Sequence, residues 1–139
     1  FNKIVTKDLW FYIYDEDILA SRAYSPSIKS PDNAPIGCSS LQFEIYSNNN
    51  QNSQYNENEL MENTKYAIKK LNLANDDQIL FMNRKFVKYG NVIFYKEMEK
   101  HREVVRNFLK LNDVISCGRF GEWDYLWSNQ SFMSGYNSL

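Results

Sequence analysis

The chain has 139 residues, of which 43% are hydrophobic, 16% aromatic and 24% charged, and this profile predicts one soluble globular domain over residues 1–139. Its formal net charge of -1 argues against a binder of nucleic acid or of an anionic membrane. No apolar run approaches the ~18 residues of a membrane span, and the N-terminus lacks signal-peptide order, so we expect a cytoplasmic protein. Cys38 and Cys117 lie far apart and His101 is the single histidine, so neither a zinc set nor a disulfide scaffold is expected.

The N-terminal half predicts three extended segments. Trp10–Tyr14 is a dense run of β-forming residues, Asp15–Asp17 is a polar turn and Ile18–Tyr24 is a second extended segment, which together indicate an antiparallel hairpin. Ser40–Tyr46 alternates polar and apolar residues and predicts a third strand. Between the hairpin and this strand, three prolines favour an ordered but irregular loop: Pro26, Pro31 and Pro35.

A polar insertion is expected to separate this sheet from a helix. Residues 47–58 are rich in Asn and Gln and poor in apolar side chains, so they predict a flexible segment. Asn56 with Glu59 three residues later is typical of a helix start. Apolar residues then recur at helical spacing, which predicts a helix that ends near Asn72.

The C-terminal half combines apolar runs with two helical patterns. Three stretches predict further strands: Gln78–Val87, Asn91–Tyr95 and Val114–Cys117. Glu97–Leu111 carries apolar residues on one side and charged residues on the other, which predicts an amphipathic helix. A last helix is expected from Ser128 or Asn129 to about Gly135. The sequence therefore predicts an α+β fold, with a mainly antiparallel mixed sheet and about three covering helices.

The segment that follows Val114–Cys117 is the most informative for function. Gly118 lets a ligand approach the backbone closely, Arg119 supplies a forked donor for a diphosphate, and the helix that follows adds the positive end of a dipole. These features indicate a phosphate site. Taken alone, the spacing favours glycines that only shape a turn, with Arg119 paired to Glu122 or Asp124.

The stretch from Val114 to Gly135, VISCGRFGEWDYLWSNQSFMSG, resembles the C-terminal flavin-binding signature of FAD-dependent oxidoreductases of the amine oxidase and UDP-galactopyranose mutase-like superfamily. In that family a Gly-Arg-aromatic-Gly turn precedes an aromatic pair and the helix that meets the flavin. Earlier segments are similar to the family's substrate-domain strands and to its penultimate strand and helix: Trp10–Tyr14, Arg22, Pro31–Leu41, Glu44, Tyr89–Tyr95 and 97–111. The resemblance covers most of the chain outside the Asn-rich insertion, and it implies the C-terminal portion of a two-domain flavoprotein.

The resemblance also implies roles for individual residues. Gly118 and Arg119 would lie against the FAD pyrophosphate, and Trp123 and Tyr125 would stand near the isoalloxazine ring. The backbone amides that begin the last helix would face N1 and the C2 carbonyl of the flavin, where a helix N-terminus stabilises negative charge. The implied cofactor contacts are Gly118, Arg119, Phe120, Gly121, Glu122, Trp123, Tyr125, Asn129, Gln130 and Ser131. The implied substrate contacts are Arg22 and Tyr95.

Two departures from the family pattern matter. The five glycines, at 37, 90, 118, 121 and 135, cannot compose the Gly-x-Gly-x-x-Gly fingerprint that holds the ADP half of FAD. We therefore expect FAD to bind only in a longer parent, whose N-terminal dinucleotide-binding half is the missing partner of this chain. The run Ser128–Gln130 stands where many relatives have Met followed by an acid, which keeps the capping chemistry but removes a charge near the cofactor.

Two hypotheses for function follow. In the first, this chain, which opens without Met, is the C-terminal part of an FAD-dependent enzyme, inactive alone, and supplies the flavin-contacting helix and part of the substrate wall. An oxidation of a C–N or C–H bond and a mutase-like attack by flavin N5 both fit, with an amine or a nucleotide sugar as substrate. The alternative is a non-enzymatic binding or scaffold module that keeps the fold without the cofactor. A sheet without its partner half exposes apolar surface, which predicts self-association of the isolated chain.

Overall fold

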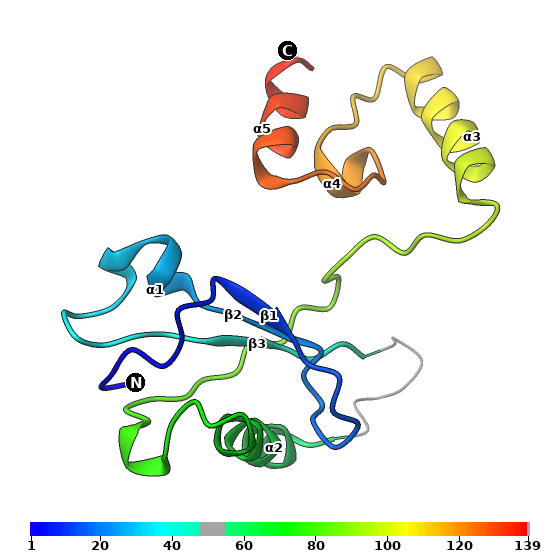
Figure 1. Ribbon diagram of the computed structural model, residues 1–139. Coiled ribbons are helices and arrows are strands. Elements are labelled where there is room, and N and C mark those ends of the chain that lie inside the picture. Colours follow the sequence, from blue (N-terminus) through cyan, green and yellow to red (C-terminus); the bar gives the residue numbers. More distant parts are fainter. Residues whose placement is uncertain (48–54, 139) are drawn as a thin grey trace. The chain divides into compact units, whose positions relative to one another are not determined.

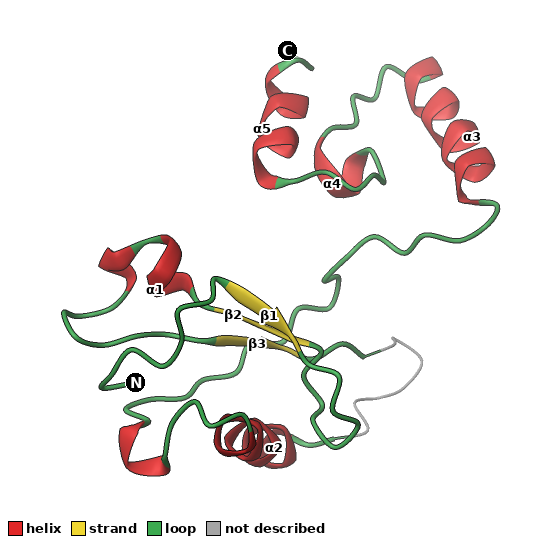
Figure 2. Cartoon of the chain, viewed as in Figure 1, coloured by secondary structure: helices red, strands yellow, loops and turns green. Residues whose placement is uncertain are grey.

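The computed structural model describes residues 1–47 and 55–138, which form two compact units. We name them the N-terminal unit, Phe1–Phe86, and the C-terminal unit, Val87–Leu139. Among these residues the strands all belong to the N-terminal unit, and the C-terminal unit is built from helices and loops (Figure 1, Figure 2). The combination of a small sheet with several helices confirms the predicted α+β class. A single domain over residues 1–139 stays a prediction.

The sheet of the N-terminal unit has three short antiparallel strands in the order β1-β2-β3 among the described residues. These are β1 (Trp10–Tyr12), β2 (Arg22–Tyr24) and β3 (Gln42–Glu44). Phe11 lies opposite Ala23, which lies opposite Phe43. The hairpin and the third strand are therefore confirmed, although each ladder is shorter than the β-forming run that predicts it.

One face of this sheet is covered by α2 (Glu57–Lys70), the helix expected after the insertion (Figure 1). Ala23 is fully buried, and the core joins residues of the hairpin to the helix: Ile13, Ile18, Ala20 and Ala67, with Phe11, Phe43, Ile45 and Leu71 packed against them. The helix begins with the predicted capping box, in which the Glu59 amide donates to Asn56 Oδ1 at 3.0 Å and the Asn56 amide donates to Glu59 Oε2 at 2.7 Å. The insertion itself falls mainly on residues 48–54, outside the described residues.

A polar network ties the hairpin turn to the far end of α2. Lys70 Nζ lies 2.8 Å from Asp15 Oδ1 and 2.6 Å from Asp17 Oδ1, and the Tyr66 hydroxyl donates to Asp17 Oδ2 at 2.6 Å. Asn63 adds two bonds to the backbone of the turn, because its Oδ1 accepts from the Leu19 amide and its Nδ2 donates to the Asp17 carbonyl. The network therefore fixes the turn against the helix that covers the sheet.

This network makes the stability of the N-terminal unit depend on pH. Hydrogen bonds from Lys70 and then from Tyr66 hold the pKa of Asp17 below its ordinary value of 3.8. Because folding lowers this pKa, the stabilisation is complete above about pH 4 and is lost as the pH falls through the folded-state value. We expect Asp17→Asn to lower the urea midpoint modestly at neutral pH and to reduce the further loss on acidification. An equal acid loss in the parent and the variant would contradict this role of Asp17.

The proline-rich loop is more regular than expected. Pro26 starts a single helical turn, α1 (Pro26–Lys29), and Pro31 starts a 3₁₀ turn, η1 (Pro31–Asn33). Both prolines occupy the first turn of their element, where the missing N–H costs nothing and the fixed φ favours helical backbone. The prediction of an irregular loop is therefore wrong at these two turns.

The C-terminal unit contains α3 (Met98–Leu111), α4 (Gly118–Gly121) and α5 (Ser128–Tyr136). The first and last confirm predicted helices, although Trp127, rather than Ser128 or Asn129, is the residue before the first turn of α5. None of the described helices combines the length and the apolar character needed to cross a membrane.

Three predicted strands are wrong in the described residues. Gln78–Val87, Asn91–Tyr95 and Val114–Cys117 belong to no β-ladder, and Gln78 instead ends a 3₁₀ turn, η2 (Asp76–Gln78). A strand is stabilised by backbone hydrogen bonds to a neighbouring strand, and the described part of the chain offers these stretches no such neighbour.

Candidate functional site

The candidate site is built around the glycine turn, Gly118–Gly121, in the C-terminal unit. Cys117 has extended backbone angles, and Gly118 then reverses the chain with a φ of +74°. An L-residue is strained at that angle, and a Cβ placed on Gly118 would meet no atom within 4 Å. The need for glycine is therefore conformational, and the space beside its Cα is open.

One serine of α5 joins the two ends of this turn. The Gly118 amide donates to Ser134 Oγ at 2.8 Å, and the Ser134 hydroxyl donates to Glu122 Oε1. The Glu122 amide in turn donates to the Gly118 carbonyl at 2.8 Å. Glu122 thus closes the turn and does not face outward from it.

Two arginines of α3, four residues apart on one side of the helix, hold the segment that follows the turn. Arg106 Nη2 donates to the Glu122 carbonyl at 2.5 Å and lies 3.6 Å from Glu122 Oε2. Arg102 Nη1 lies 3.1 Å from Asp124 Oδ2 and donates to the Trp123 carbonyl at 3.2 Å. Sequence reasoning missed both arginines and Ser134. The i,i+4 spacing places both arginines on one side of a helix, but it does not reveal their partners.

Arg119 has a different environment from these two arginines. Its guanidinium carbon lies 4.8 Å from the centre of the Tyr125 ring, within the range of a cation–π contact. Within the described residues it forms no ion pair, and its buried Nε has no hydrogen-bond partner. The expectation that Arg119 pairs with Glu122 or Asp124 is wrong, because Arg106 and Arg102 occupy those carboxylates.

Two pairs of aromatic rings involve residues of the turn and of the segment that follows it. Phe120 and Trp123 meet edge to face with ring centres 6.3 Å apart, and Phe94 lies 6.3 Å from Tyr125. Trp123 has a φ of +50°, an unusual value for a bulky residue, and the Arg102 contact to its carbonyl holds it there. The structure thus brings Tyr125 to Arg119 and places Trp123 beside Phe120.

The three backbone amides for which cofactor contacts are expected lie at the start of α5. Gln130 Oε1 accepts from the Trp127 amide at 2.8 Å, and the Ser131 amide donates to the Trp127 carbonyl at 2.8 Å. The Ser131 amide therefore belongs to the ladder of the helix. The amides of Asn129 and Gln130 precede that of Ser131, in the first turn of α5, where backbone N–H groups have no acceptor within the helix.

The two expected substrate contacts lie in different units, Arg22 in the N-terminal unit and Tyr95 in the C-terminal unit. Arg22 of β2 lies 2.8 Å from Glu44 of β3, whose carboxylate also accepts from the Tyr46 hydroxyl at 2.5 Å. The bond to Glu44 raises the pKa of Arg22 further above its ordinary range. Burial by itself raises the pKa of Glu44, but the hydrogen bonds from Arg22 and Tyr46 outweigh it and lower that pKa.

Tyr95 of the C-terminal unit lies just before α3. Its hydroxyl is 2.9 Å from Nδ1 of His101, and both side chains are exposed. The pair is an ordinary surface contact at the start of the helix. The contact with His101 orients the Tyr95 side chain within the C-terminal unit.

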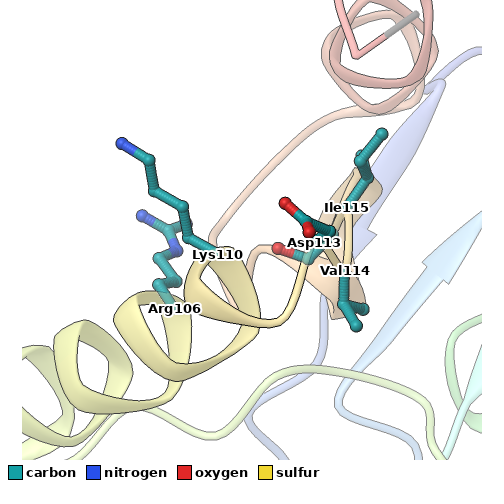
Figure 3. A pocket seen from close by; sticks show the side chains of 6 residues that line it. Arg106, Lys110, Asp113, Val114 and Ile115 are labelled. Atoms are coloured by element: carbon teal, nitrogen blue, oxygen red, sulfur yellow. The ribbon is translucent and has the colours of Figure 1, made fainter.

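A shallow open hollow lies at the C-terminal end of α3, and Figure 3 shows the residues that line it. They are Arg106, Lys110, Asp113, Val114, Ile115 and Ser116. None of the residues implied as cofactor contacts is among them. A second hollow lies along the charged side of α3 and also excludes Arg119.

Comparison with known proteins finds a solved structure with a similar fold. No family model matches the sequence, and no curated protein matches it. The crystal structure of reduced UDP-galactopyranose mutase is similar in fold, with a TM-score of 0.82 and 24% sequence identity. The match covers 95% of this chain but 29% of the mutase chain. The described α+β fold therefore resembles one part of the mutase fold, and the chain spans less than a third of the length of the mutase chain.

Proposed function

We propose that this chain is the substrate-side, flavin-contacting portion of a larger flavoprotein with a UDP-galactopyranose mutase-like fold. The fold likeness supports the architecture, and the sequence resemblance at residues 114–135 supports the cofactor. The observation that carries the proposal is Arg119, which forms no ion pair within the described residues and whose buried Nε lacks a hydrogen-bond partner there, beside an open glycine turn. An unsatisfied buried donor costs about 1–3 kcal/mol, and a bound diphosphate would relieve that cost.

The residues present fit FAD in part. Arg119 would hold the pyrophosphate, and the amides of Asn129 and Gln130 would face the electron-accepting end of the flavin ring, where the helix dipole favours negative charge. The Ser131 amide, which the resemblance also implies, is committed to α5. The ADP half needs a dinucleotide-binding fingerprint that this sequence lacks, so the remaining part of the fold must supply it.

The chemistry would belong to the cofactor. When bound, FAD supplies either an electron sink for oxidation or a nucleophilic ring nitrogen for a mutase-like exchange. This chain would bind and orient the cofactor through Arg119 and the first turn of α5. Arg22 and Tyr95 would contact the substrate, an amine or a nucleotide sugar, in a protein that we expect in the cytoplasm.

Visible absorbance tests the proposal. The chain and the longer protein that contains it are each purified, incubated with FAD and passed through a desalting column. We expect a flavin spectrum in the longer protein and none in the chain alone, because the chain holds only part of the site. A longer protein that stays colourless after incubation with FAD would overturn the proposal and favour a scaffold module that keeps the fold without the cofactor.

A further inference from the structure

Arg119 and Glu122 stand at a spacing at which an arginine and a glutamate ordinarily form an ion pair. Arg119 lies within α4, and Glu122, three residues later, keeps helical backbone angles. Side chains three residues apart are neighbours on a helical turn, and opposite charges at that spacing attract each other. Within the described residues, however, no ion pair joins Arg119 to Glu122. The contacts of the carboxylate explain why.

Both oxygens of the Glu122 carboxylate have partners in other helices. Arg106 of α3 lies 3.6 Å from Oε2 and also donates to the Glu122 carbonyl at 2.5 Å. The Ser134 hydroxyl of α5 donates to Oε1. Hydrogen bonds to a charged group are among the stronger ones, and the Glu122 side chain is 30% exposed, so water screens these contacts only in part. The carboxylate nearest to Arg119 in the sequence is therefore held by two other side chains.

The second acid after the turn, Asp124, is also bonded elsewhere. Arg102 lies 3.1 Å from Asp124 Oδ2, and the Tyr125 amide donates to Oδ1 at 2.7 Å. Arg102 pairs with Glu99 as well, so this arginine serves two acids. The charged group of Arg119 meets the ring of Tyr125 instead, 4.8 Å from its centre. A cation–π contact attracts the guanidinium but does not neutralise it.

We infer that Arg106 and Ser134 are positioning residues for the anion site: they hold the carboxylate of Glu122, and this leaves the guanidinium of Arg119 to bind a diphosphate. The inference rests on the proposed function, in which Arg119 holds such a group. A carboxylate and a diphosphate compete for the same planar set of donors on an arginine. A change that releases the Glu122 carboxylate therefore lowers the affinity of Arg119 for the anion.

Nuclear magnetic resonance of the isotope-labelled chain measures this affinity at Arg119 itself. The probe is inorganic pyrophosphate, and the readout is the shift of the Arg119 Nε–H signal, which is assigned by its absence in Arg119→Ala. Arg106→Met removes the charge that holds Glu122 and keeps a side chain of similar length. We expect this variant to bind pyrophosphate about two- to fivefold more weakly, which is the factor that one partly exposed ion pair contributes.

A double-mutant cycle separates this role from a general effect of charge. Glu122→Gln removes the competing carboxylate, so it should restore the parental affinity in Arg106→Met. In the parent, where the carboxylate is already held, the same change should alter the affinity little. If net charge alone mattered, Glu122→Gln would raise the affinity by the same factor in both backgrounds.

Lys110→Met is the matched control for the loss of charge. Lys110 lies beside Arg106 on α3, one turn further along, and both line the hollow shown in Figure 3. Within the described residues it has no ion pair with Glu122. Its replacement removes the same charge without releasing the carboxylate, so the affinity for pyrophosphate should stay close to that of the parent.

Ser134→Ala releases the same carboxylate without changing any charge. We expect a smaller loss of affinity than in Arg106→Met, and Glu122→Gln should reverse this loss too. If Ser134 only supported the fold, the loss would persist in the double variant. Circular dichroism of each variant checks that its helices form, and the Ser134 pair decides the matter if Arg106→Met does not fold.

The outcomes separate this inference from the proposed function. Equal effects of Glu122→Gln in the parent and in Arg106→Met overturn the inference, even if the longer protein binds FAD. An Arg119 signal that does not respond to pyrophosphate overturns it as well. The expected coupling in the chain, together with a longer protein that binds no FAD, upholds the roles of Arg106 and Ser134 and overturns only the proposed function.

Discussion

If the longer protein binds FAD as proposed, replacing Arg119 by alanine is expected to weaken cofactor affinity by about 10- to 100-fold. A charge-assisted hydrogen bond contributes about 1.5–3 kcal/mol, and each 1.4 kcal/mol is a factor of ten in affinity. Neither Glu122 nor Asp124 would compensate, because both are held by arginines of α3. The change should leave the fold intact, because the alanine removes a donor that has no partner in the described chain.

Titration with FAD, followed by flavin fluorescence, measures this loss. Arg119→Lys keeps the charge but not the planar fork, so we expect an intermediate affinity. Lys100→Ala removes the same charge from an exposed position on α3 and serves as the control, with an affinity close to that of the parent. Equal affinities in Arg119→Ala and Lys100→Ala would show that the guanidinium does not contact the cofactor.

The second large effect is expected at Ile68 of α2. Ile68 is 2% exposed, which makes it the largest fully buried apolar side chain in the described chain. Truncation to alanine removes buried methyl groups and leaves a cavity, at a cost of about 2–5 kcal/mol in the free energy of unfolding. Such a loss is a large fraction of the stability of a small domain.

Urea unfolding followed by circular dichroism tests this expectation. Ile68→Val should cost about 0.5–1.5 kcal/mol, because it removes one methyl group. Ile36→Ala, at a position that is fully exposed, should change the stability by less than about 0.5 kcal/mol. If Ile68→Ala and Ile36→Ala proved equally stable, the Ile68 side chain would not be packed in a core.

The elements that the sequence predicts well are those whose signals are local. The capping pair Asn56 and Glu59 marks the start of α2 within one turn, and the apolar spacing in Glu97–Leu111 marks α3. The hairpin is predictable because its two strands are neighbours in the sequence. The strand predicted at Val114–Cys117 is absent from the described residues, because a strand depends on a partner and no local pattern reveals whether that partner is present.

The same distinction applies to the candidate site. Gly118 and Arg119 can be recognised from the sequence, because a glycine after an apolar run, followed by an arginine, is a local pattern. Ser134, Arg102 and Arg106 do not, because their roles depend on how the helices of the C-terminal unit fold back on the turn. Those contacts leave Arg119 without an ion pair among the described residues, and the sequence alone does not reveal this.

The sequence separations of the polar contacts in the two units imply an order of folding. In the C-terminal unit, the bonds that hold the glycine turn join residues 12 to 21 positions apart. In the N-terminal unit, the bonds between the hairpin turn and α2 join residues 44 to 53 positions apart. Short loops close at a smaller entropic cost and form sooner. The contacts of the glycine turn should therefore form early in folding, before the hairpin turn packs against α2.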